Sequence, residues 1–219
     1  MTETRLSNDP NWRYLLREYY ELYRFLPSGG SAPIRAHQRV VREAISRTIQ
    51  DNPEIKLRDP NTVPVVQHLR RSLDQGKSEK FAGLIRSLEA VSPSLTWQYG
   101  YEKVPKGLER SYGFTEIAGP NGPVITRKVI LGLVLFAPGC TYPAHAHDGI
   151  SESYVCLSGA VSENNHGVFA PGSLIFNPPN HLHRITVSDR NPSLLAWAWI
   201  GDEEKLAGQK TVFSRKSKI

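Results

Sequence analysis

Residues 139–159, GCTYPAHAHDGISESYVCLSG, bring two histidines and a glutamate together in one short segment. His145 and His147 are two positions apart, so on a strand their side chains leave the same face. After the turn residues DGIS, Glu152 and Tyr154 are again two apart and share a face of the next strand. If the strands pair around that turn, these four side chains converge. Imidazole nitrogens and a carboxylate oxygen are ligands for a borderline divalent metal ion.

A fourth ligand is expected from residues 172–183, GSLIFNPPNHLH. His181 and His183 share a strand face, and spacing alone leaves either of them as the ligand. Mixed nitrogen and oxygen ligation admits zinc, iron, manganese, nickel and cobalt. We therefore predict one divalent metal ion as the cofactor, of a kind that the pattern does not specify.

Together the two segments resemble the two motifs of the cupin superfamily. The first motif is matched by Gly139, His145, His147, Glu152 and Gly159, and the second by Gly172, Pro178 and His183. This alignment favours His183 over His181, so the resemblance implies a metal ion held by His145, His147, Glu152 and His183. The family usually has glycine where this chain has Asn180, and asparagine also tolerates a left-handed backbone.

The flanking tyrosines resemble those of the bacterial cupin-type dimethylsulfoniopropionate (DMSP) lyases. Tyr142 precedes the first histidine by three residues, and Tyr154 follows the glutamate by two. The long segment before the motifs is similar to the DddL branch more than to the shorter DddQ. The resemblance implies a metal-dependent carbon–sulfur lyase that cleaves DMSP to dimethyl sulfide and acrylate. Fold alone would not imply that reaction, because one fold hosts many chemistries.

The chemistry gives the two tyrosines different expected roles. Eliminating a β-sulfonium group requires removal of a proton beside the carboxylate, and a nearby divalent cation favours the phenolate that could take it. Tyr154, on the strand face of Glu152, is the expected base. Tyr142 would face away under strict alternation and reach the pocket rim only if Pro143 bends the strand. We expect it to orient the substrate.

Two tryptophans are expected to contact the substrate. Trp197 and Trp199 share a face of the strand LLAWAWI, and aromatic faces bind a sulfonium cation well. The alternative is that both fill the barrel interior as ordinary core.

The rest of the chain predicts an α+β fold. Helical spacing of apolar residues begins at Asp9-Pro10 and recurs near 33–49, 63–73 and after Ser78. From about Leu95 the chain changes to short runs rich in Val, Ile, Tyr and Trp between Gly, Pro and Asn. We predict a helical N-terminal extension, residues 1–92, and an antiparallel cupin β-barrel, residues 93–219. His37 and His68 lie among helix arginines and are expected to be solvated.

Composition limits the partners. Lys and Arg number 27 against 21 Asp and Glu, a net charge of +6, which suits a small anionic or zwitterionic ligand better than nucleic acid. The resemblance to the DMSP lyases implies that this ligand is the zwitterion DMSP. The first residues lack a signal-peptide pattern, and the longest apolar run, VILGLVLFAP, is too short to span a membrane. We expect a soluble, cytoplasmic homodimer. The alternatives are an iron-dependent cupin dioxygenase of a small thiol or carboxylate, or a non-catalytic ligand-binding cupin.

Overall fold

The computed structural model describes residues 4–78, 80–101, 104–208 and 212–213. Four helices come first, with three 3-10 turns among them: η1 Leu6–Asn8, α1 Pro10–Phe25, α2 Ala32–Asp51, η2 Pro64–His68, α3 Leu69–Gly76, α4 Ala82–Val91 and η3 Ser92–Ser94. The Asp9 side chain accepts from the backbone N–H groups of the first turn of α1, and Ser31 caps α2 in the same way. The four predicted helical segments are confirmed, except that the first half of the one predicted over 63–73 is the 3-10 helix η2 and the α-helix begins at Leu69.

The strands form two sheets. The six-stranded sheet has the order β2-β1-β3-β10-β5-β8, made of β1 Tyr112–Gly119, β2 Val124–Ile125, β3 Ile130–Phe136, β5 Ser151–Ser158, β8 Leu174–Asn177 and β10 Ser193–Ile200. The five-stranded sheet has the order β11-β4-β9-β6-β7, made of β4 Thr141–Ala146, β6 Val161–Glu163, β7 His166–Phe169, β9 His183–Val187 and β11 Val212–Phe213. Neighbours are antiparallel except β1 and β2. Short helices α5 Leu108–Ser111 and α6 Glu203–Ala207 flank the strands.

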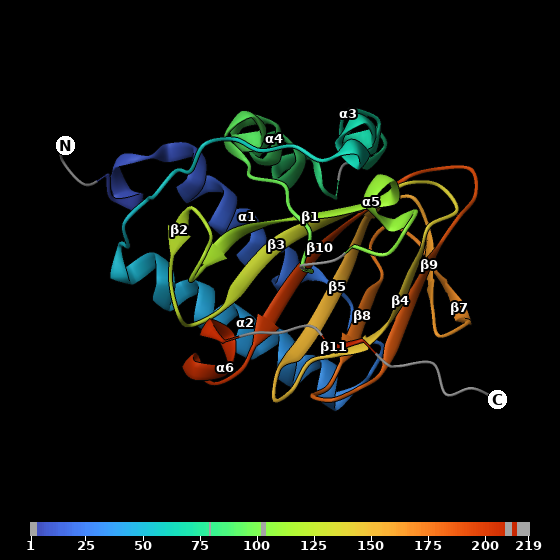
Figure 1. The fold of residues 1–219 in the computed structure, drawn as a ribbon. Coiled ribbons are helices and arrows are strands. Elements are labelled where there is room, and N and C mark those ends of the chain that lie inside the picture. The colour runs from blue at the N-terminus through green and yellow to red at the C-terminus, as the bar shows by residue number, and fades with distance from the viewer. Residues whose placement is uncertain (1–3, 79, 102–103, 209–211, 214–219) are drawn as a thin grey trace.

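The six-stranded sheet is buried on both faces, and its strands alternate between two apolar clusters. In β3, Leu131, Leu133 and Leu135 pack toward the helices, while Ile130 and Val134 pack toward the other sheet. A strand covered on both faces reads as a continuous apolar run, as β3 does. The predicted barrel is thus present as two facing sheets with helices behind one of them (Figure 1).

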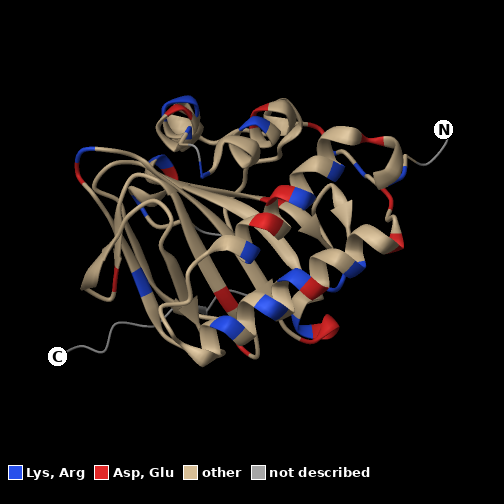
Figure 2. Ribbon diagram, turned by 180° about the vertical axis from the view of Figure 1, so that it is seen from behind, with Lys and Arg blue, Asp and Glu red and all other residues tan. Residues whose placement is uncertain are grey.

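Helices α1 and α2 lie behind the six-stranded sheet (Figure 2), and their charged residues are exposed or half-buried. The expectation that His37 is solvated is wrong: its exposed fraction is 6%, and its Nε2 lies 2.8 Å from the Ser153 hydroxyl. His37 stands one helical repeat before Val41 and two before Ile45, so it lies on the stripe that packs against the sheet.

The helices and the strands share one apolar cluster, and the division between residues 92 and 93 stays a prediction. None of the helices in the described part of the chain has the length and apolarity needed to cross a bilayer. The homodimer and the cytoplasmic location also stay predictions.

Candidate functional site

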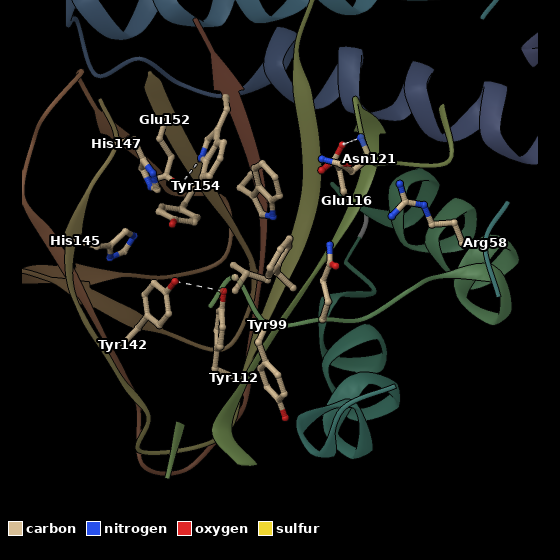
Figure 3. Close-up of a pocket in the computed structure, with 16 residues that line it drawn as sticks. Arg58, Tyr99, Tyr112, Glu116, Asn121, Tyr142, His145, His147, Glu152 and Tyr154 are labelled. Atoms are coloured by element: carbon tan, nitrogen blue, oxygen red, sulfur yellow. Dashed lines mark hydrogen bonds and ion pairs between the residues drawn. The ribbon is translucent and has the colours of Figure 1, made fainter. Parts of the chain in front are cut away.

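Four buried side chains meet between the two sheets. His145 comes from β4, His147 from the turn after it, Glu152 from β5 and His183 from the start of β9. The pairing of β4 with β9 sets His145 opposite His183. One ligand atom from each of the four lies within 4.8 Å of the others. Figure 3 shows His145, His147 and Glu152 pointing into the same space.

Backbone carbonyls orient two of the imidazoles. His145 Nδ1 lies 2.9 Å from the carbonyl oxygen of Pro143, and His183 Nδ1 lies 3.0 Å from that of His181. A carbonyl only accepts, so each Nδ1 must carry the hydrogen. The lone pair is then on Nε2, the nitrogen left for a ligand, which is the arrangement that metal-binding histidines use.

Trp199 orients the carboxylate. Its indole Nε1–H donates to Glu152 Oε1 at 2.6 Å in a buried hydrogen bond. The other oxygen, Oε2, faces the imidazoles, 2.9 Å from His183 Nε2 and 3.6 Å from His147 Nε2. One oxygen is therefore held by protein, and the other remains for the centre of the cluster.

The cluster fits a metal ion because its inner atoms lack adequate partners. Among the described residues, His147 Nε2, His183 Nε2 and Glu152 Oε2 are buried without a hydrogen bond of good geometry. Buried polar atoms in native proteins are almost always satisfied. A divalent cation accepting electron pairs from these atoms would satisfy them, and three imidazoles with one carboxylate form a usual donor set.

The pKa shifts in the cluster favour the protonation states that bind metal, neutral histidine and ionised glutamate, for three of its four residues. Burial, with His183 nearby, lowers the pKa of His145 to about 3. Burial also lowers the pKa of His147. Burial alone would raise the pKa of Glu152, but the surrounding histidines hold it well below its usual range. His183 differs: burial opposes its charge, yet contact with Glu152 raises its pKa.

Tyr142 enters the cavity rather than facing away, so strict alternation is wrong at this position. Between Tyr142 and His145, β4 advances three residues while its partner β9 advances two, from Ile185 to His183. Such a bulge changes which residues share a face. Pro143 lies inside it, where a missing N–H is tolerated. Tyr142 is buried, and its ring centroid is 4.7 Å from that of His145.

Three of the four clustered residues, His145, His147 and Glu152, line one cavity of about 330 Å³, whereas His183 is fully buried behind its wall. Of the predicted residues, its wall contains Tyr142, His145, His147, Glu152, Tyr154, Trp197 and Trp199. His181 is exposed and lies outside the four-residue cluster. The two indoles are therefore at the cavity wall, with ring centroids 5.0 Å apart.

The family follows from comparison with known proteins. The family model described as dimethylsulfoniopropionate lyase matches residues 36–195. The chain belongs to the DMSP lyase family. It is 49% identical over 219 residues to the Cereibacter sphaeroides protein named "Putative dimethylsulfoniopropionate lyase DddL", covering 99% of this chain and 94% of that one. The predicted likeness to the DddL branch is confirmed.

Solved structures of DMSP lyases share the fold. The DMSP lyase DddQ from Ruegeria pomeroyi aligns with a TM-score of 0.70 at 20% identity, over 96% of this chain and 100% of that one. A chain from the crystal structures of the DMSP lyases RdDddP and RnDddQII aligns with a TM-score of 0.69 at 24% identity, over 94% and 98%. The predicted cupin fold is confirmed.

Strand β1 supplies residues of the DMSP lyase cavity that the sequence did not single out. Tyr112, Phe114 and Glu116 all line the cavity. The Tyr142 hydroxyl donates to that of Tyr112 at 3.3 Å and also contacts the Tyr101 hydroxyl. Tyr112, Phe114 and Glu116 stand at alternate positions of YGFTE, so their side chains share one face of β1. Only long-range pairing shows that this face turns toward the metal ligands.

Proposed function

We propose that this chain eliminates dimethyl sulfide from DMSP and leaves acrylate. The observation that carries the proposal is one cavity containing a convergent ligand cluster, two tyrosines and two indoles. These groups match the parts of the substrate, which has a carboxylate, an acidic proton beside it and a sulfonium leaving group. Membership of the DMSP lyase family supports the same substrate.

His145, His147, Glu152 and His183 hold one divalent ion in this proposal, and zinc, iron, manganese, nickel or cobalt would suit them. When bound, the ion supplies positive charge that attracts the substrate carboxylate, acidifies the neighbouring carbon and favours a phenolate nearby. Trp199 keeps Glu152 turned toward that position through its indole N–H.

Tyr154 is the base. It lines the cavity two residues after Glu152 on the same face of β5. The electron pair of the α C–H bond forms the new double bond, the pair of the C–S bond leaves with sulfur, and the proton passes to the Tyr154 oxygen. That proton returns to solvent before the next turnover. Burial and the Glu152 charge raise the pKa of Tyr154, so the phenol keeps its proton at neutral pH until a cation is nearby.

Tyr142, Trp197 and Trp199 bind the substrate in this proposal. The Tyr142 hydroxyl is held by its contacts with Tyr112 and Tyr101, which suits a fixed hydrogen-bonding group. The two indoles offer apolar faces to the sulfonium.

The reaction is tested by incubating the purified, metal-loaded chain with DMSP and measuring dimethyl sulfide in the headspace and acrylate in solution. We expect equal amounts of both products, formed at the same rate with and without oxygen. Product formation that stops without oxygen would indicate the dioxygenase alternative. Binding of DMSP without any product would indicate the non-catalytic alternative.

The base is tested with Tyr154→Phe. Losing a general base typically lowers the rate by about 10²–10⁴, so we expect kcat to fall by that factor while the bound metal, measured by mass spectrometry, is retained. A Tyr154→Phe variant with its metal and the wild-type rate would overturn this assignment.

A further inference from the structure

The cavity has a second polar end, built around Glu116. Figure 3 shows Glu116 and Asn121 on the side of the cavity away from His145 and His147. The exposed fraction of Glu116 is 5%, although it lines the same cavity as the metal cluster. The function proposed above gives this carboxylate no part.

Sheet register connects the two ends. Glu116 pairs with Gly132, Gly132 with Trp197, and Trp197 with Tyr154 across four neighbouring strands. Directly paired residues share a sheet face, so this row runs along the cavity wall from Glu116 to the expected base. At about 4.8 Å per strand spacing, the row spans roughly 14 Å.

Aromatic surface fills the middle of the row. A Cβ added at Gly132 would lie 2.5 Å from Trp197 Cζ2, so the indole lies directly over the glycine. Phe114 packs edge-on against Trp197, with ring centroids 6.3 Å apart. The wall thus passes from metal ligands through aromatic faces to a carboxylate, and aromatic faces beside an anion are suited to an onium cation.

The chain is shaped to keep the Glu116 carboxylate in place. The backbone N–H of Asn121 donates to Glu116 Oε1 at 2.8 Å. Gly119 has φ +150, and a Cβ there would lie 2.2 Å from the same oxygen, so a side chain at 119 would displace the carboxylate. The loop after β1 is therefore folded closely around Glu116.

This carboxylate lacks an ion-pair partner among the described residues. Burying a charge without a partner is costly. Burial raises the pKa of Glu116 to about 7, and the N–H groups of Asn121 and Gly122 and the charge of Arg58 act against that rise. A cation entering the cavity would favour the ionised form.

Resting on the proposed function, we propose that Glu116 is a specificity-determining residue: its carboxylate selects ligands that carry a sulfonium or ammonium group in addition to the carboxylate bound at the metal end. A carboxylate ligand of the same shape whose other end carries no charge gains nothing from Glu116. Arg58, an exposed residue of the cavity wall, acts in the opposite sense on a cation.

The test compares two ligands that differ only in charge, 3-(trimethylammonio)propanoate and 4,4-dimethylpentanoate. Their affinities for the metal-loaded protein are measured by titration calorimetry. Glu116→Gln keeps the shape and the acceptor for Asn121 but removes the charge. We therefore expect the affinity for the ammonium ligand to fall by about tenfold relative to 4,4-dimethylpentanoate, which has no cationic group. Glu116→Asp should retain most of the cation preference.

The ratio of the two affinities decides the proposal. A ratio that stays the same in Glu116→Gln, or in Glu116→Ala if the first variant does not fold, overturns it. Dimethyl sulfide release is measured on the same wild-type sample. If the ratio changes as expected but no dimethyl sulfide forms, the proposed reaction fails and cation selection stands. If dimethyl sulfide forms and the ratio is constant, the reaction stands and the role of Glu116 is wrong.

Discussion

The polar residues on the two faces of the six-stranded sheet differ in whether they have hydrogen-bond partners within the protein. On the cavity face, β5 presents Glu152, which has a buried oxygen without a good hydrogen-bond partner. On the helix face, one residue along, Ser153 Oγ lies 2.8 Å from the Tyr23 hydroxyl and 2.8 Å from His37 Nε2. Tyr19 also donates from α1 to the carbonyl of Gly132 at 2.8 Å.

Because of this difference, substitutions on the helix face and on the cavity face should affect different properties of the protein, stability and function respectively. On the helix face, Tyr19, Tyr23, His37 and Ser153 have hydrogen-bond partners within the protein, so removing one of these groups should cost stability and spare catalysis. On the cavity face, Glu152 Oε2, His147 Nε2 and His183 Nε2 have no hydrogen-bond partner among the described residues, and we propose that a metal ion satisfies them. Removing one of these groups should therefore cost function more than stability. Each substitution below tests one side of this contrast.

The largest effect is expected from His183→Ala on the cavity face. It removes one of four ligands, and we expect metal affinity to fall by more than about a hundredfold, since even losing a residue that orients a ligand costs 10–100-fold. Turnover should fall with it. Metal content and dimethyl sulfide release measure the two effects.

His181→Ala is the matched control for this change. Its side chain is exposed and outside the cluster, while its backbone carbonyl still accepts from His183 Nδ1. We expect near wild-type metal content. A greater metal loss in His181→Ala than in His183→Ala would show that the ligand is assigned to the wrong histidine.

The second effect concerns stability. In the folded state burial raises the pKa of Glu116 to about 7 from an ordinary 4.5. The folded protein therefore loses stability as pH rises through that window, because the unfolded chain ionises first. Once the pH is above both pKa values, the free energy of unfolding has fallen by about 3 kcal/mol.

Glu116→Gln does not titrate, so its stability relative to wild type should increase between pH 5 and pH 8 by up to about 3 kcal/mol. Urea unfolding at the two pH values measures the difference. A difference that does not change with pH would mean that the buried carboxylate carries no such cost.

Much of the cavity face was predictable because its residues are local in sequence. Two-residue spacings placed His145 with His147 and Glu152 with Tyr154, and Asn180 adopts φ 64 as expected where the motif has glycine. The Tyr142 face was not predictable by alternation, because a bulge around Pro143 changes the register. The position of Glu116 at the cavity wall was not predictable either, because it depends on the pairing of strands that are far apart in the sequence.

The helix face was harder to predict. Periodicity located the helices and their buried stripes, but it did not identify the polar contacts of Tyr23 and His37 with Ser153. These contacts join residues more than a hundred positions apart, and a histidine among arginines has the pattern of a solvated residue. The register between a helix and a sheet depends on packing, which a single sequence does not encode locally.

The third effect distinguishes the two tyrosines of the cavity. Tyr142→Phe removes a hydroxyl that binds Tyr112 and, by our proposal, the substrate. We expect kcat/KM to fall by about tenfold, as for one lost hydrogen bond, and kcat to change less than in Tyr154→Phe. Tyr112→Phe keeps the Tyr142 hydroxyl and is the control. A loss of about a thousandfold in Tyr142→Phe, with activity kept in Tyr154→Phe, would exchange the proposed roles.

The smallest effect is expected on the helix face, from Tyr23→Phe. The change removes one of the two partners of Ser153, which keeps its contact with His37, so we expect a loss of about 1 kcal/mol in the free energy of unfolding. Tyr14→Phe is the matched control on α1, because Tyr14 is 58% exposed and its hydroxyl should matter within about 0.5 kcal/mol. Lyase activity should stay within about twofold of wild type in both variants, since neither hydroxyl reaches the cavity. If Tyr23→Phe lowered kcat strongly without a loss of stability, the helix face would position Glu152 and Tyr154 for catalysis, and the two faces of β5 would not be separable.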